Sequence, residues 1–177
     1  MIKRALPFLL VFFILSIATP AFGLNQDPVV IYPWQIPVNE NGVRIVTVTR
    51  GQPVVLGANW GACTRGLVTA FALTSDISYV IDGRPVLRNP RLDSLYWKFP
   101  PEPVTHPSAS ACVNNTTQVW TIYWAYDLKW LSLGDHPAQF EFRNDRLHID
   151  GFDNDGDGKP DKFDLQLAVD FIIRVVE

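Results

Sequence analysis

Five acidic residues lie at regular spacing in one short stretch near the carboxyl end of the chain, residues 153–164. They occupy relative positions 1, 3, 5, 9 and 12 of the stretch, and Gly158 stands at position 6. A segment that presents oxygen atoms at alternate residues can wrap around a hard cation needing six to eight ligands, and calcium tolerates such irregular geometry. The stretch therefore predicts a calcium-binding loop.

This segment resembles the calcium loops of EF-hands, dockerin repeats and thrombospondin type 3 repeats, over less than a tenth of the chain. The resemblance implies calcium as the bound ion. The expected ligands are side-chain oxygens and one backbone carbonyl, that of the seventh residue: Asp153, Asp155, Asp157, Lys159, Asp161 and Asp164. Magnesium is the weaker candidate, because it demands strict octahedral geometry.

Three departures limit the resemblance to the ligand set. Pro160 stands where an EF-hand has an aliphatic residue that bonds to a partner loop, and Asp164 replaces the long bidentate glutamate. The flanking sequence predicts strands and not helices. The alternative interpretation is a solvated hairpin turn, in which Asp and Gly are both common, but the mutual repulsion of five carboxylates favours a bound cation.

Other residues that could do chemistry are not in patterns known for it. His106, His136 and His148 fit no zinc-ligand spacing, and no serine lies in a G-x-S-x-G setting. We interpret the histidines as polar turn residues and expect no enzymatic activity. A small secreted hydrolase or lyase is the alternative, and it requires a cleft that brings one histidine to a carboxylate.

The amino-terminal residues 1–23 have the three parts of a secretory signal peptide: a basic start at Lys3 and Arg4, an apolar stretch 5–18, and the small-x-small site 21–23. The apolar stretch is shorter than the ~20 residues that span a bilayer, which argues against an uncleaved anchor. We expect a mature chain of residues 24–177, forming one domain that is secreted or held at the cell surface, with no membrane span.

Charge and cysteine content further restrict the class of protein and its compartment. Of the 15 basic residues, loss of Lys3 and Arg4 leaves 13 against 18 acidic ones, a formal charge of −5, which argues against nucleic acid as a partner. In an oxidising compartment Cys63 and Cys112 are expected to form a disulfide. A reactive thiol or a metal ligand is the alternative.

Most of the mature chain has the pattern of β-strands. Eight stretches alternate or are rich in β-branched residues: 29–32, 43–49, 54–60, 67–73, 77–81, 119–126, 139–143 and 163–175. We expect the first three to be antiparallel neighbours, and Asp82 and Gly83 to form a hairpin turn. Because residues 89–110 contain five prolines, we expect them to form a surface connection.

Two stretches also allow a helix. Residues 67–73 could form a helical turn, and Ala168, Ile172 and Val176 repeat at helical spacing, but Val, Ile and Thr content favours strands in both. The resulting all-β chain predicts a β-sandwich, with an immunoglobulin-like sandwich as first choice and a jelly roll as second. The Cys…Trp…Cys spacing of true immunoglobulin domains is absent.

The aromatic content gives the remaining alternative function. The strand 119–126 places Trp120, Ile122, Trp124 and Tyr126 on one face, and Leu128 and Trp130 extend it. Four tryptophans lie near strand ends or loops: Trp34, Trp60, Trp97 and Trp130. Exposed rings there would suit a carbohydrate-binding module, whereas buried rings would be core.

We therefore expect a secreted, calcium-binding, non-catalytic sandwich that acts as an interaction or structural module, with an unidentified extracellular protein or glycan as partner.

Overall fold

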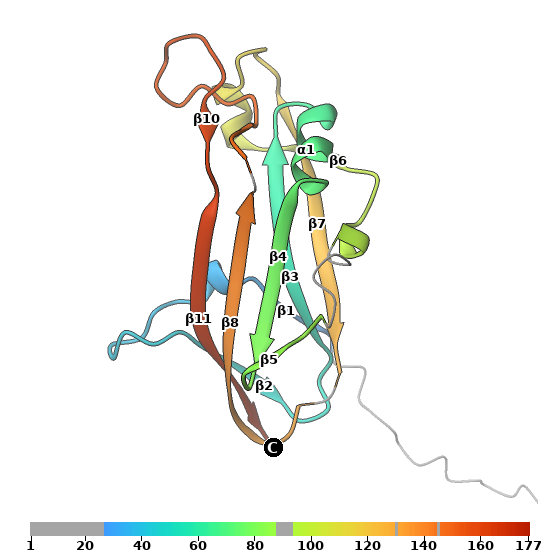
Figure 1. Cartoon of the computed structure of the whole chain (residues 1–177), viewed down its shortest axis with the longest axis vertical. Coiled ribbons are helices and arrows are strands. Elements are labelled where there is room, and N and C mark those ends of the chain that lie inside the picture. Colours follow the sequence, from blue (N-terminus) through green and yellow to red (C-terminus); the bar gives the residue numbers. More distant parts are fainter. Residues whose placement is uncertain (1–26, 88–93, 130, 145) are drawn as a thin grey trace, which may run out of the picture.

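The computed structural model describes residues 27–87, 94–129, 131–144 and 146–177, and it contains two multi-stranded β-sheets packed face to face (Figure 1). The expected signal peptide and Trp130 lie outside the described residues. The four-stranded sheet has the order β1 (Val29–Ile31), β3 (Val54–Ala62), β7 (Gln118–Leu128), β6 (Glu102–Thr105). The five-stranded sheet has the order β2 (Ile45–Thr49), β11 (Gln166–Val176), β8 (Gly134–Asn144), β4 (Ser75–Ile81), β5 (Arg84–Pro85).

The expectation that the first three strands are antiparallel neighbours is wrong. β1 runs parallel to β3, pairing with residues Val54, Val55 and Leu56, and β2 joins the other sheet, where it runs parallel to the end of β11. Pro33 begins a short 3-10 helix, η1 (Pro33–Gln35), that ends β1 early. The chain can therefore cross from one sheet to the other before it reaches β2.

The long strands β8 and β11 form the centre of the five-stranded sheet. They pair antiparallel over ten residue pairs, which places Phe142 opposite Leu167 and Phe140 opposite Val169. Odd-numbered residues of β11 from Val169 onward point into the core, as the alternating sequence predicts, and the helical alternative is excluded. Two details differ from expectation: β8 already begins at Gly134, and Phe163 belongs to the separate short strand β10 (Lys162–Phe163).

The core fills the space between the two sheets with aromatic rings. Trp124 of β7 stacks on Tyr79 of β4, with ring centroids 5.7 Å apart, and Tyr79 also contacts Phe140 of β8 at 4.8 Å. The Tyr79 hydroxyl donates a hydrogen bond to the Gly57 carbonyl of β3 across the interface, at 2.8 Å. Ring packing and this buried hydrogen bond together hold the sheets in register.

Residues 67–73 were expected to form a strand, and this is wrong, because Arg65–Ala72 forms the helix α1. The Thr64 side chain caps the helix by accepting a hydrogen bond from the Leu67 amide at 3.3 Å. The buried residues Val68, Phe71 and Ala72 follow helical spacing and cover one end of the core. The cap and this apolar face outweigh the β-propensity of the segment.

The predicted hairpin turn and disulfide are confirmed, and the predicted surface connection 89–110 is confirmed only in part, because it contains a strand. The hairpin turn between β4 and β5 has positive φ at Asp82 (53°) and Gly83 (72°), as a tight two-residue turn requires. Within the described part of residues 89–110, β6 is the edge strand of its sheet and is followed by the 3-10 helix η3 (Pro107–Ala111). Cys63 and Cys112 form the expected disulfide, with Cα atoms 5.6 Å apart.

Candidate metal site and adjoining groove

The expected calcium loop lies at one end of the sandwich, between β9 (His148–Ile149) and β10, beside η3 (Figure 1). It forms part of the connection from β8 to β11, the two strands that pair at the centre of the five-stranded sheet. β9 and β10 pair with each other antiparallel, so the loop leaves and rejoins a small ribbon. Both ends of the loop are thereby held close together.

Backbone hydrogen bonds tie the start of the loop to both segments that carry the disulfide. The Cys63 amide donates to the Asp150 carbonyl at 2.8 Å, the Val113 amide to the Gly151 carbonyl at 3.2 Å, and the Asp153 amide to the Ala111 carbonyl at 2.8 Å. Because Cys63 and Cys112 form a disulfide, the two segments that hydrogen-bond to the start of the loop are covalently joined to each other. The position of Asp153, the first expected ligand, is therefore fixed by hydrogen bonds to segments that the disulfide holds together.

Three of the six expected ligands are close together. One carboxylate oxygen from each of Asp153, Asp155 and Asp157 lies within 4.8 Å of the other two. Gly156 and Gly158 have φ values of 80° and 83°, a left-handed conformation that glycine adopts without strain and that bends the chain around this point. The donors are hard oxygens, the ligand type that calcium prefers.

Asp153 lies at the centre of the loop and organises its backbone. Its carboxylate accepts hydrogen bonds from the amides of Gly156, Asp157 and Gly158, at 2.7, 3.1 and 2.9 Å. Desolvation alone would raise the pKa of the Asp153 carboxyl, but these N–H donors outweigh it and hold the pKa below its usual value. These hydrogen bonds favour the charged form of the carboxylate, which is the form that binds calcium.

The remaining expected ligands do not belong to this group of three. The Asp161 carboxylate accepts hydrogen bonds from the backbone and side-chain nitrogens of Asn154, each at 2.9 Å, and so closes the loop internally. The Lys159 amide donates to Asp157 at 2.8 Å, and Asp164 is the acceptor of a long contact, 3.5 Å, from Gln166. Their roles as ligands stay predictions.

The three histidines lie apart and differ in environment, and the interpretation of all three as polar turn residues is wrong for two of them. His136 is buried in β8: its Nδ1 lies 2.8 Å from the Asp82 carboxylate and its Nε2 lies 2.9 Å from the Ser132 carbonyl. Burial lowers the pKa of His136, but hydrogen bonds to these two acceptors and the nearby carboxylates outweigh it and raise the pKa overall.

His148 is also buried, in β9, where its Nε2 lies 3.0 Å from the Thr74 hydroxyl and its ring meets Phe71 edge-on. Burial lowers the pKa of His148, and the charge of Arg146 lowers it further. His106 is exposed and caps η3, its Nδ1 accepting a hydrogen bond from the Ser108 amide at 3.2 Å. Thus two of the histidines hold the fold together and the third caps a short helix.

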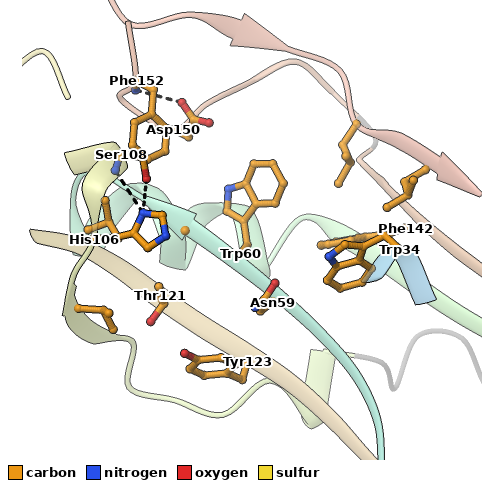
Figure 2. Close-up of a pocket in the computed structure, with 15 residues that line it drawn as sticks. Trp34, Asn59, Trp60, His106, Ser108, Thr121, Tyr123, Phe142, Asp150 and Phe152 are labelled. Carbon is orange, nitrogen blue, oxygen red and sulfur yellow. Dashed lines mark hydrogen bonds between the residues drawn. The ribbon is translucent and has the colours of Figure 1, made fainter. Parts of the chain in front are cut away.

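A groove of about 580 Å³ lies next to the loop (Figure 2). One side is the outer face of the four-stranded sheet, where Asn59 of β3 and Tyr123 of β7 are found, and the other side contains Trp60, Trp34 and Leu167 of β11. Its lining includes His106, Ser108 and Asp150, but Figure 2 shows the Asp150 carboxylate bonded to the Phe152 amide and not to the histidine.

Asp150 is a half-buried carboxylate at one end of this groove. Burial raises its pKa, and the charge of Asp161 adds to the effect, although the Phe152 amide opposes it with a hydrogen bond of 3.1 Å. Among the described residues no Lys or Arg forms an ion pair with it. The sequence analysis did not predict this groove. The signal for it was a difference in strand length: Pro33 ends β1 after three residues, so β1 is too short to cover the edge of the nine-residue strand β3.

The described tryptophans do not form a row of exposed rings. Of the five whose burial is described, Trp97 and Trp124 are buried, and Trp34, Trp60 and Trp120 are half-buried. Trp60 is stacked between Phe71 and Phe163, with centroid separations of 4.2 and 5.2 Å. These rings contribute chiefly to packing between the sheets, α1 and the loop ribbon.

Comparison of the chain with protein-family models, with curated proteins and with solved structures finds no significant match. Among the described helices, none has the length and apolar character needed to cross a membrane. The functional assignment therefore depends on the residues and their geometry.

Proposed function

We propose that this protein is a secreted, non-catalytic β-sandwich stabilised by calcium, which acts as an interaction or structural module outside the cell. The observation that carries the proposal is the group formed by Asp153, Asp155 and Asp157, whose carboxylate oxygens lie within 4.8 Å of one another. Without a cation these charges repel one another, so a bound calcium ion would stabilise the loop. The proposed ligand set is completed by Asp161, Asp164 and the Lys159 carbonyl.

The role of the ion follows from the position of the loop in the fold. The loop belongs to the connection between β8 and β11, and its base is braced by the disulfide. An ion that binds only the folded arrangement stabilises it by mass action. Because extracellular calcium is plentiful, a dissociation constant of about 10⁻⁴–10⁻³ M would suffice for this purpose.

We also propose that the sandwich is of the immunoglobulin-like type. An immunoglobulin domain has strands A, B, E and D in one sheet and C, F and G in the other. Taking β1 as A, β3 as B, β4 as C, β6 as D, β7 as E, β8 as F and β11 as G reproduces that order, with β5 beside C and β2 beside G. Two features differ: β1 runs parallel to β3, and the disulfide does not join B to F.

Three observations support a non-catalytic role and export. His136 contacts the Asp82 carboxylate, but its ring is buried in β8 and not open to a substrate. His148 is engaged with Thr74, and His106 with the amide and hydroxyl of Ser108. The formed disulfide fits an oxidising compartment. The sequence of residues 1–23 has the composition of a signal peptide, which predicts export and a mature chain starting at Leu24.

Thermal unfolding of the mature chain, residues 24–177, tests the proposal. The melting temperature is expected to fall in a calcium chelator, to recover when calcium is added in millimolar amounts, and to respond much less to magnesium. Isothermal titration of the chelator-treated protein should show one calcium-binding event. Identical melting curves with and without chelator, together with no heat of calcium binding, would refute the calcium role.

A further inference from the structure

Two strand edges on the same side of the sandwich have no neighbouring strand among the described residues along more than half of their length. β1 pairs with Val54, Val55 and Leu56 of β3, and no other described strand pairs with the rest of that nine-residue strand on this side. In the other sheet, β2 pairs only with the last residues of β11, from Ile172 onward. An unpaired edge of this kind is a template for an additional strand.

The backbone polar groups of Asn59 and Gly61 point out of this open edge. The Pro53 carbonyl accepts a hydrogen bond from the Val29 amide, and the Cys63 amide donates one to the Asp150 carbonyl. The backbone N–H and C=O groups of the odd-numbered residues between 53 and 63 therefore point away from β7. Alternate residues of a strand direct their N–H and C=O groups to the same side. No described residue hydrogen-bonds to the backbone of Asn59 or Gly61 on this edge.

The groove shown in Figure 2 lies along this edge and is mainly apolar. Apolar side chains from η1, both sheets and the loop ribbon line it: Trp34, Trp60, Phe142, Phe152, Leu165 and Leu167. A peptide in extended conformation could therefore bond to the β3 edge and place every second side chain among these residues.

The charge around the groove indicates that the bound peptide contains a basic residue. Asp150 is half-buried at one end, next to the acidic loop, and it has no Lys or Arg partner among the described residues. No Lys or Arg occurs among the described residues that line the groove. A half-buried carboxylate without a cation is stabilised by a basic group supplied from outside.

We propose that the groove binds an extended segment of a partner protein, which adds as a strand to the edge of β3 at Asn59–Gly61. Its alternate apolar side chains lie against Trp60 and its neighbours, and one Lys or Arg pairs with Asp150. This inference rests on the proposed role as an interaction module, and it gives that role a partner class: a protein with an exposed, extended, basic and apolar segment.

The test is selection of a phage-displayed library of random peptides, about ten residues long, on the biotinylated mature chain in millimolar calcium. Enriched peptides are expected to alternate apolar residues and to contain Lys or Arg. A synthetic copy of the best peptide, added to ¹⁵N-labelled protein, should shift the amide resonances of Asn59 and Gly61 and slow their hydrogen exchange.

Asp150→Asn is the informative variant, because asparagine keeps an oxygen that can accept the Phe152 hydrogen bond while removing the charge. It should weaken binding of the selected peptide by about tenfold. Asp127→Asn, at an exposed position near the far end of β7, removes the same charge away from the groove and should leave binding unchanged.

Several results would overturn the inference: no enrichment, enriched peptides without a basic residue, equal affinity for the wild type and Asp150→Asn, or amide shifts confined to β11. Concentration-dependent self-association through the β3 edge would also overturn it, because the occupant would then be a second copy. A protein whose melting temperature responds to calcium but which selects no such peptide would refute this inference alone. Peptide binding without a calcium response would refute only the calcium role.

Discussion

Gly151 packs directly against Cys63: a Cβ atom added to Gly151 would lie 2.7 Å from the Cβ atom of Cys63 and 3.3 Å from its sulfur. Gly151 also has a φ of 92°, a backbone conformation that other residues rarely adopt. The start of the acidic loop and the disulfide thus approach each other so closely that only glycine fits between them.

Gly151→Ala is therefore expected to destabilise the protein by about 3 kcal/mol, through both the contact and the backbone strain. For a domain of this size that corresponds to a fall in melting temperature of roughly 6–12 °C. Gly156→Ala is the matched control, since Gly156 has a φ of 80° but no atom within 4 Å of an added Cβ. It should cost only about 1 kcal/mol, and equal losses for the two variants would contradict the close packing.

Removal of the disulfide should affect both stability and the acidic loop. The Cys63→Ala/Cys112→Ala double variant removes a cross-link between residues 49 positions apart. In the chain-entropy description this is expected to lower the free energy of unfolding by about 4 kcal/mol. Because the loop base bonds to both cysteine segments, calcium affinity should also fall. Denaturant unfolding and calcium titration measure the two effects. A folded double variant with unchanged calcium affinity would show that the backbone hydrogen bonds alone position the loop.

Substitution within the acidic loop tests the proposed ligands. Asp155→Asn removes one charge from the carboxylate group but leaves the backbone hydrogen bonds to Asp153 in place. It should weaken calcium binding on the order of tenfold, since affinity depends on the number of charged ligands. Asp170→Asn, at an exposed position on β11, removes the same charge elsewhere and serves as the control. Titration calorimetry gives both constants, and equal affinities would exclude Asp155 as a ligand.

The His136–Asp82 pair should make stability depend on pH. The pKa of His136 is raised in the folded protein, so its contribution is fully present below the unfolded value of about 6.5 and is lost as the pH rises through the folded value. Asp82→Asn should remove much of this dependence, whereas Asp76→Asn, which removes a partly buried acidic residue of β4 paired with Arg143, should keep it.

Urea unfolding at about pH 6 and about pH 8 measures the difference between these two variants. Comparing them cancels the opposite contribution of His148, whose pKa is lowered by burial and by Arg146 and which is common to both. If Asp82→Asn and Asp76→Asn lose equal stability between the two pH values, the His136–Asp82 contact does not act as described.

The local features of the fold were predictable because they depend on neighbouring residues. Alternation identifies a strand within a few residues, as at β11, and Asp82–Gly83 identifies a tight turn from the φ values it requires. Residues 67–73 show where this approach fails. Their composition favours a strand, but the Thr64 cap and the burial of Val68 and Phe71 against the core make them helical.

By itself, the sequence determined the β-class of the chain, the pairing of its two cysteines and the spacing of the acidic loop. Each of these follows from residue types or from the period of a pattern. Only the tertiary structure decided that β1 and β2 join different sheets and leave the β3 edge open, and that Asp150 lies beside it. Strand partners are chosen by contacts between residues far apart in the chain, which no local pattern contains. The acidic stretch predicted a calcium-binding loop, but the disulfide that braces its base and the groove beside it come together only in the folded chain.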